Sequence, residues 1–196
     1  MNSKLKIKDI LLIALLTAVY MLIYLVIMMI ITPLGGFGHA ISPGINSLFS
    51  GMVIYFMARK IGKMWQYSIL TLLIMGIFSI MGGGYLPWFI SSMLTAIIAD
   101  AIASRSKDTS VLKIAIASGI MHMGQAWGAI IPSIFFLNSY RESWIKRVQS
   151  VDAMNEYIRY TAGYWGAISS IIVFVLAVAG IYIAHTILKK YFKEEL

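Results

Sequence analysis

The stretch Gly119-Ile-Met-His122-Met-Gly124-Gln125-Ala-Trp127-Gly128 lies inside a long apolar run, 111–137. At 1.5 Å per residue, His122 lies roughly 16 Å from the start of that run, near the centre of a hydrocarbon core about 30 Å thick. A polar side chain at that depth needs a partner inside the protein or a water-filled cavity. The run therefore predicts a membrane helix whose middle carries polar groups.

The polar and the small residues of this helix lie on different faces. Ser118, His122 and Gln125 follow helical spacing and share one face. Gly124 and Gly128 lie on another face, where they allow a neighbouring helix to approach closely. Two interpretations of His122 and Gln125 stay open: they bind a ligand, or they only hydrogen-bond adjacent helices.

The composition of the chain is that of a membrane protein. Of 196 residues, 60% are hydrophobic and 12% are charged, and the mean hydropathy is +0.83. These values indicate an all-α, polytopic membrane protein. There is no cysteine, which excludes disulfides and thiolate metal sites. The net charge of +8 resides in short clusters between apolar runs, a pattern typical of membrane topology and not of nucleic-acid binding.

We expect a single domain, 1–196, with six spans. The approximate spans are 10–31, 42–58, 65–81, 85–103, 111–137 and 161–188. Twelve of the 16 Lys and Arg residues precede the first span, follow the last, or join spans two to three and four to five. The positive-inside rule therefore predicts that both termini are cytoplasmic. Asp100, beside Arg105 and Lys107, is interpreted as a snorkelling or paired interfacial acid, or as part of a partner-binding face.

The expected outer loops carry candidate binding residues. The loop 32–44 is rich in Gly and Pro and almost uncharged, so we expect it to fold over the outer end of the bundle, with His39 at or near the mouth. A solvated loop histidine is the alternative. After the glycines at 82–84, Tyr85 and Trp88 suit either stacking on a flat ligand or an interfacial aromatic belt.

Further candidates lie in span two and near the last span. Asn46 lies in the outer part of span two, and Tyr164 and Trp165 begin the outer half of span six. The segment 138–160 has an amphipathic helical period, which predicts a surface helix over the cavity. Polar and aromatic side chains thus gather in the outer half of the bundle, which suggests a pocket open to the outside.

Four classes of protein compete for this pattern. One of them, a structural or scaffold membrane protein, does not explain the outward cluster of polar residues. A membrane enzyme needs a nucleophile with a base, a carboxylate pair or a metal cluster, and the sequence contains none of these patterns. A stand-alone small transporter generally carries intramembrane acids or internal repeats, which are not convincing here. A binding subunit that takes its energy from other proteins fits best, because no GxxxxGK[ST] nucleotide motif is present.

The chain resembles the substrate-binding S components of energy-coupling factor (ECF) transporters, and within them the Trep-Strep (MptD-like) set. The features that carry the resemblance are the length, the six expected spans, the basic C-terminal end and Ala14-x-x-x-Ala18 in the first span. The resemblance implies a protein of the prokaryotic plasma membrane. It also implies that the alanine face docks on a transmembrane T component, which two ABC-type ATPases drive. The S component itself captures cargo from outside and needs no cofactor or metal of its own.

The residues indicate a mainly apolar, flat cargo. Stacking by Tyr85, Trp88, Trp127, Tyr164 or Trp165 and hydrogen bonds from His122 and Gln125 fit a vitamin-like heterocycle. Haem is the alternative cargo, with His39, His122, Met121 or Met123 as axial ligands.

Overall fold

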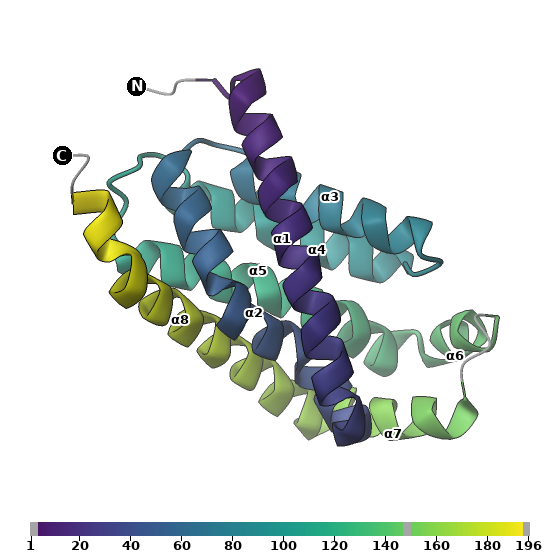
Figure 1. Cartoon of the computed structure of the whole chain (residues 1–196). Coiled ribbons are helices and arrows are strands. Elements are labelled where there is room, and N and C mark those ends of the chain that lie inside the picture. The colour runs from purple at the N-terminus through teal and green to yellow at the C-terminus, as the bar shows by residue number, and fades with distance from the viewer. Residues whose placement is uncertain (1–3, 147–149, 194–196) are drawn as a thin grey trace.

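The computed structural model describes residues 4–146 and 150–193, and these residues form helices without strands (Figure 1). The elements are α1 (Ile7–Ile31), the short 3₁₀ helix η1 (Thr32–Leu34), α2 (Gly35–Lys60), α3 (Gln66–Ile80), α4 (Leu86–Ala103), α5 (Val111–Phe135), α6 (Leu137–Ile145), α7 (Val151–Thr161) and α8 (Gly163–Lys193). The expected all-helical fold is confirmed.

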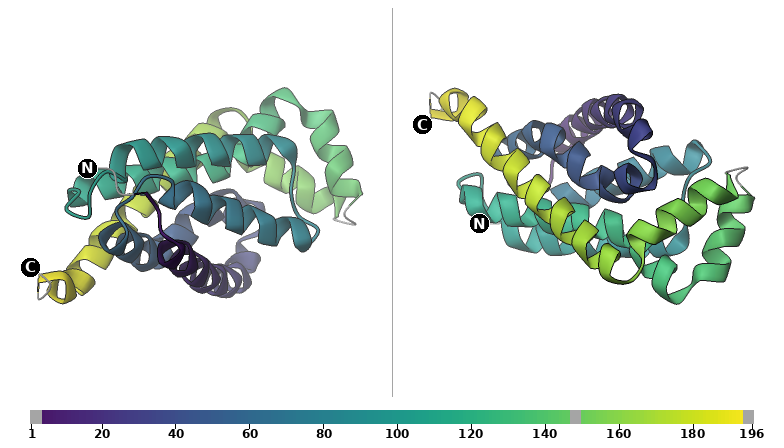
Figure 2. Two further views of the ribbon diagram at one scale, coloured as in Figure 1. Left: turned by 90° about the horizontal axis from the view of Figure 1, so that it is seen from above. Right: turned by 90° about the horizontal axis from the view of Figure 1, so that it is seen from below.

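The helices form one bundle with two different ends. The long helix α8 runs diagonally along α2 and α5, and α4 packs along α5 (Figure 2). The first helix, α1, crosses the bundle against α2 and α3. Both termini lie at one end, while the short helices α6 and α7 lie at the other (Figure 1).

Four stretches of the described chain are long and apolar enough to cross a membrane. They are Ile7–Lys60, Leu86–Ala103, Val111–Phe135 and Gly163–Phe192. The first stretch contains α1, η1 and α2, so it has the length of two spans joined by a tight turn. Helix α3 has only 15 residues and is apolar but shorter than these. The six-span count therefore stays a prediction.

Glycines set the closest contacts between helices. A Cβ built on Gly124 would overlap the Thr95 side chain of α4, and one on Gly128 would overlap the Trp88 ring. A Cβ on Gly51 would lie 2.5 Å from the carbonyl group of Gly180, where α2 crosses α8. The predicted close approach at Gly124 and Gly128 is confirmed, and α4 is the helix that uses it.

The expected loop over 32–44 is wrong, because almost all of it is helical. Gly35 has a positive φ of 57°, which glycine adopts readily, and α2 begins there. The glycines that suggested a loop serve helix packing instead. A Cβ on Gly36 would lie 2.7 Å from the backbone of Glu156 in α7, and one on Gly44 would lie 2.7 Å from Cα of Val173 in α8.

The expected single surface helix over 138–160 is two helices, α6 and α7, and residues 147–149 between them lie outside the described chain. A serine side chain caps the second helix: the Ser150 hydroxyl oxygen accepts a hydrogen bond from the Ala153 N–H at 3.4 Å. Both helices contact α5, and α7 also packs against α2.

The interpretation of Asp100 as an interfacial acid is wrong. Asp100 is completely buried, and its carboxylate accepts four hydrogen bonds. The donors are the backbone N–H groups of Tyr67 (3.1 Å) and Ser68 (2.9 Å) and the hydroxyls of Ser68 and Ser104 (2.7 Å each). Since Trp65 at the N-cap supplies no side-chain cap, Asp100 caps α3 from a neighbouring helix.

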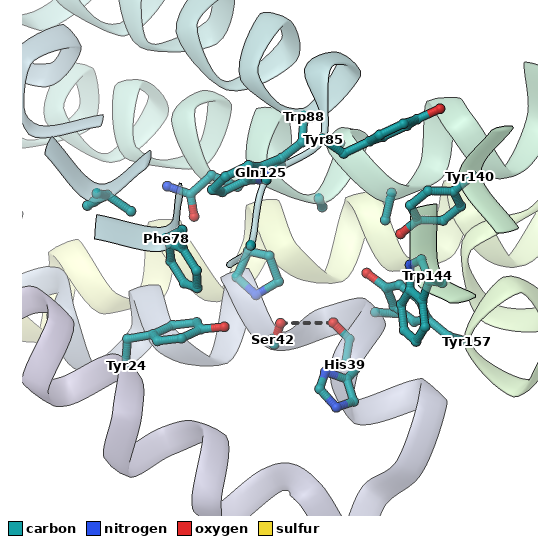
Figure 3. Close-up of a pocket in the computed structure, with 18 of the residues that line it drawn as sticks. Tyr24, His39, Ser42, Phe78, Tyr85, Trp88, Gln125, Tyr140, Trp144 and Tyr157 are labelled. Carbon is teal, nitrogen blue, oxygen red and sulfur yellow. Dashed lines mark hydrogen bonds between the residues drawn. The ribbon is translucent and has the colours of Figure 1, made fainter. Parts of the chain in front are cut away.

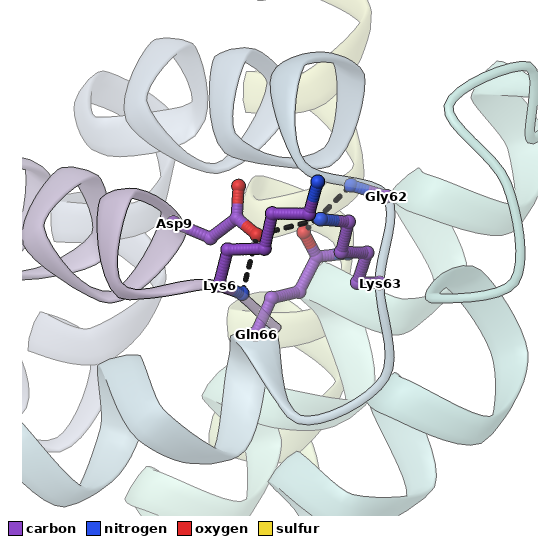
Figure 4. Close-up of polar contacts among 5 residues, drawn as sticks. All are labelled: Lys6, Asp9, Gly62, Lys63 and Gln66. Atoms are coloured by element: carbon purple, nitrogen blue, oxygen red, sulfur yellow. Dashed lines mark hydrogen bonds and ion pairs between the residues drawn. The ribbon is translucent and has the colours of Figure 1, made fainter. Parts of the chain in front are cut away.

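A second polar contact ties the start of α1 to the turn between α2 and α3 (Figure 4). One oxygen of Asp9 accepts a hydrogen bond from the Lys6 backbone N–H at 2.8 Å and pairs with the Lys63 ammonium at 2.6 Å. In the same turn the Gly62 N–H donates to the Gln66 side chain at 3.2 Å. Asp9 and Lys63 therefore hold the start of α1 against the turn between α2 and α3.

Candidate functional site

A cavity of about 340 Å³ lies at the α6–α7 end of the bundle, opposite the termini (Figures 1 and 3). Residues of α1, α2, α3, α4, α5, α6, α7 and the turn before α4 line it. The volume falls within the range of small-molecule sites. Within the parts of the chain that the structure describes, no Asp, Glu, Lys or Arg lines the cavity.

One wall of the cavity is aromatic and consists of Tyr24, Phe78 and Trp88, which we call the first wall (Figure 3). The rings of Tyr24 and Phe78 meet edge to face with centroids 5.0 Å apart, and those of Phe78 and Trp88 with centroids 5.5 Å apart. Gly128 leaves the space that Trp88 occupies. The wall joins α1, α3 and α4, and its faces suit stacking on a flat molecule.

The second wall comprises His39, Tyr157, Trp144, Tyr140 and Tyr85, each ring in contact with the next (Figure 3). The centroid separations range from 5.3 Å to 6.1 Å. The Tyr85 hydroxyl also donates to the Ser139 hydroxyl at 3.1 Å. Burial raises the pKa of the Tyr157 hydroxyl well above its ordinary value, so this phenol is neutral at physiological pH.

The deeper part of the cavity is polar but uncharged. Tyr20 and Gln125 line it, and the Tyr20 hydroxyl lies close to the side chains of Gln125, Asn46 and Ser50. Asn46 is 1% exposed, yet neither atom of its amide has a hydrogen-bond partner among the described residues, and the same holds for Nε2 of Gln125. We call Tyr20, Asn46, Ser50 and Gln125 the polar floor.

Several residues predicted from the sequence come together here. His39, Tyr85, Trp88 and Gln125 line the cavity. Asn46 does not line it but belongs to the polar floor. Because these residues come from α2, α4 with the turn before it, and α5, only the folded chain brings them within reach of one ligand.

Other predicted residues lie elsewhere. His122 is completely buried and does not line the cavity. The indole N–H of Trp127 donates to the Ser170 hydroxyl at 3.1 Å, and its ring packs against the α5–α8 contact. Tyr164 and Trp165 are 78% and 42% exposed at the start of α8. Trp127, Tyr164 and Trp165 therefore do not line this cavity.

His122 joins two helices. Its Nε2 lies 3.1 Å from the Tyr20 hydroxyl of α1, and its Nδ1 lies 2.8 Å from the Ser118 carbonyl oxygen. Both ring nitrogens are thus engaged, as in the interpretation that His122 hydrogen-bonds adjacent helices. Among the described residues, Tyr20 connects His122 to the cavity.

Sequence reasoning missed much of the lining, namely Tyr20, Tyr24, Phe78, Tyr140, Trp144 and Tyr157. Tyr20 and Tyr24 did carry a usable signal, since two tyrosines four residues apart share one face of the first apolar helix. Phe78 carries none, because a phenylalanine in a membrane helix is as often turned to lipid.

The candidate haem ligands do not converge. Of His39, His122, Met121 and Met123, only His39 lines the cavity. Met121 is completely buried in the core between the helices. In the described ranges no group of three or more His, Asp or Glu side chains is arranged to hold a metal ion.

The fold and cavity define a class: a helical integral membrane protein with an uncharged aromatic pocket at one end of its bundle. The chain belongs to the Trep_Strep family, described as hypothetical bacterial integral membrane proteins, whose family model matches residues 7–194. No curated protein matches the chain, and no solved structure does.

Proposed function

We propose that this protein is the substrate-capturing subunit of an ECF-type ABC importer, with ATP hydrolysis supplied by partner subunits. The observation that carries the proposal is the uncharged aromatic cavity at one end of the bundle, opposite both termini. The proposal takes up the six spans and the cytoplasmic termini predicted from charge, so that the cavity end faces outwards.

The cavity supports capture of a micronutrient that is neutral and flat. Aromatic rings line two walls, so a planar molecule gains contact on both faces. A ligand with strong charge would lose its hydration without gaining an ion pair, because no formally charged side chain of the described residues lines the space.

The outer surface of α1 supports docking to a T component. Ala14 and Ala18 lie one turn apart, and both are exposed on the bundle surface. Small side chains there let a helix of another protein approach closely. The completely buried residues of this helix, such as Ile13 and Tyr20, point the other way into the bundle.

The test is purification of the protein, gently, from its native membrane, followed by native mass spectrometry and a visible absorption spectrum. We expect a T component and two ABC-type ATPases to co-purify, and a bound mass without a haem band. A haem band would instead identify haem, the alternative predicted from the sequence, as the cargo. His39 would then be the first residue to replace. Absence of the ATPases from every preparation would refute the subunit assignment.

Substitution of Ala14 separates docking from binding. Ala14→Trp places a large ring on the docking face, and Ala101→Trp makes the same change at an exposed alanine of α4. We expect the first variant, and not the second, to lose the ATPases on purification. Equal loss from both variants would show that bulk anywhere on the surface disrupts the complex.

A further inference from the structure

The hydrogen bonds of His122 fix which atom of the ring carries a proton. The Ser118 carbonyl oxygen can only accept, and it lies 2.8 Å from Nδ1, so Nδ1 carries the hydrogen. A completely buried imidazolium without a counter-ion would be costly inside a membrane, so the ring is neutral. Nε2 therefore holds a lone pair, and the Tyr20 hydroxyl at 3.1 Å donates to it.

This arrangement fixes the polarity of the cavity floor. Because Tyr20 gives its only proton to His122, its oxygen faces the polar floor as an acceptor. Close to that oxygen lie the carboxamides of Gln125 and Asn46. The amide nitrogen of Gln125 has no hydrogen-bond partner among the described residues, and neither atom of the Asn46 amide has one.

Unpaired polar groups at such depth point to a ligand that pairs with them. Buried donors and acceptors are nearly always satisfied in folded proteins, so those of the polar floor require explanation. Asn46 and Ser50 continue, at i+4 and i+8, the face of α2 on which Ser42 lines the cavity. Gln125 lies in the lining of the cavity, and Asn46 and Ser50 lie next to it, one and two turns farther along α2 from Ser42.

We propose that the polar floor recognises the edge of a neutral, planar nitrogen heterocycle in which a ring N–H stands next to a carbonyl. The ring N–H donates to the Tyr20 oxygen, and the carbonyl accepts from Nε2 of Gln125. Asn46 adds a second carboxamide beside the same oxygen. His122 is a positioning residue, since it acts only by holding the Tyr20 proton. This inference rests on the proposed function and names its substrate class.

The same geometry explains what the cavity rejects. A heterocycle that is methylated at nitrogen brings a methyl group to the Tyr20 oxygen and leaves that acceptor unpaired. A hydrocarbon of the same shape leaves the Gln125 amide unpaired as well. Sites built to hydrogen-bond a ligand group discriminate strongly against analogues that lack it.

The test uses full-length protein in lipid nanodiscs at pH 7 and two probes of one shape. Lumichrome is a flat tricyclic heterocycle with ring N–H groups beside carbonyls, and its 1,3-dimethyl derivative lacks both N–H groups. Binding is followed by quenching of tryptophan fluorescence, since Trp88 and Trp144 line the cavity. We expect lumichrome to bind about 10- to 100-fold more tightly than the dimethyl derivative.

Variants test each part of the floor. Tyr20→Phe and Gln125→Leu are expected to weaken lumichrome binding by about 10-fold or more while leaving the dimethyl derivative unchanged. His122→Leu frees the Tyr20 proton to point into the cavity. The variant should therefore bind the two probes with nearly equal affinity. His122→Gln again offers an acceptor to the Tyr20 hydroxyl and should restore part of the preference for lumichrome over its dimethyl derivative. Thermal unfolding of each variant identifies any that fails to fold.

Three results would overturn the inference: no binding of lumichrome to the wild-type protein, equal affinity for both probes, or variants that weaken both probes alike. In any of these cases the subunit assignment is judged separately, because co-purification of the ATPases does not depend on either probe. If the ATPases never co-purified but the protein still distinguished the two probes, the subunit assignment would be refuted. The proposed recognition by the polar floor would be retained.

Discussion

Replacing Asp100 by alanine is expected to destabilise the half of the bundle that carries both termini. The carboxylate is completely buried and accepts four hydrogen bonds, two of them from backbone N–H groups in the first turn of α3. Alanine leaves these N–H groups of Tyr67 and Ser68 without an acceptor. The hydroxyls of Ser68 and Ser104 can rotate to other acceptors, so the cost comes chiefly from the two backbone groups.

The magnitude follows from those two groups. Each buried N–H left unsatisfied costs about 1–3 kcal/mol, so Asp100→Ala should lower the free energy of unfolding by about 2–6 kcal/mol. For a chain of this size, that corresponds to a fall of at least about 5 °C in the unfolding temperature. Asp100→Asn keeps one acceptor oxygen but turns an NH₂ group toward donors, so its unfolding temperature should lie between those of the wild type and Asp100→Ala.

The assay is thermal unfolding in detergent, followed by the intrinsic fluorescence of the five tryptophans. Asp108→Ala is the matched control, because Asp108 is exposed in the turn after α4. We expect the control to unfold within about 1 °C of the wild type, as surface substitutions generally do. If Asp100→Ala unfolded at the same temperature as Asp108→Ala, the assignment of Asp100 as the cap of α3 would be wrong.

Three further predictions concern docking, cargo and packing. Ala14→Trp should abolish uptake in cells while leaving cargo binding by the purified protein intact, and equal loss of both would contradict the separation of the two surfaces. Trp88→Leu should weaken binding of a flat probe about 10-fold, whereas Trp127→Leu should not change it, because Trp88 lines the cavity and Trp127 does not. Gly124→Leu should lower the unfolding temperature by several degrees, since even a Cβ overlaps Thr95; an unchanged melting curve would show that α4 and α5 separate easily there.

The sequence predicted the helical class and most helix positions well, because apolar runs of this length have few alternatives in a bilayer. The sequence wrongly predicted a loop where the N-terminal end of α2 lies. Gly and Pro usually indicate a loop, and Pro43 lies inside this helix. Here the glycines are required by close contacts with α7 and α8, which depend on partners far along the chain.

The candidate site was predicted only in part, for a related reason. His39, Tyr85, Trp88 and Gln125 were predicted from their place at the expected outer ends or on the polar face of a span, and all four line the cavity. Trp127 was included on the same grounds, yet it bonds to Ser170 and faces α8. The rotation of a helix about its axis decides which of its residues face the cavity. A sequence that is apolar on nearly every face of the helix does not indicate that rotation.

The sequence by itself determined that this chain is a membrane protein of helices with polar groups at mid-depth, because burial in hydrocarbon leaves the backbone no other way to satisfy its hydrogen bonds. Only the tertiary structure decided what those polar groups do. It joined His122 to Tyr20 and assembled aromatic walls from distant helices. It also left Nε2 of Gln125 and both amide atoms of Asn46 without a hydrogen-bond partner among the described residues. Such pairings depend on distances between helices, which the packing of small and large side chains sets and no local pattern encodes.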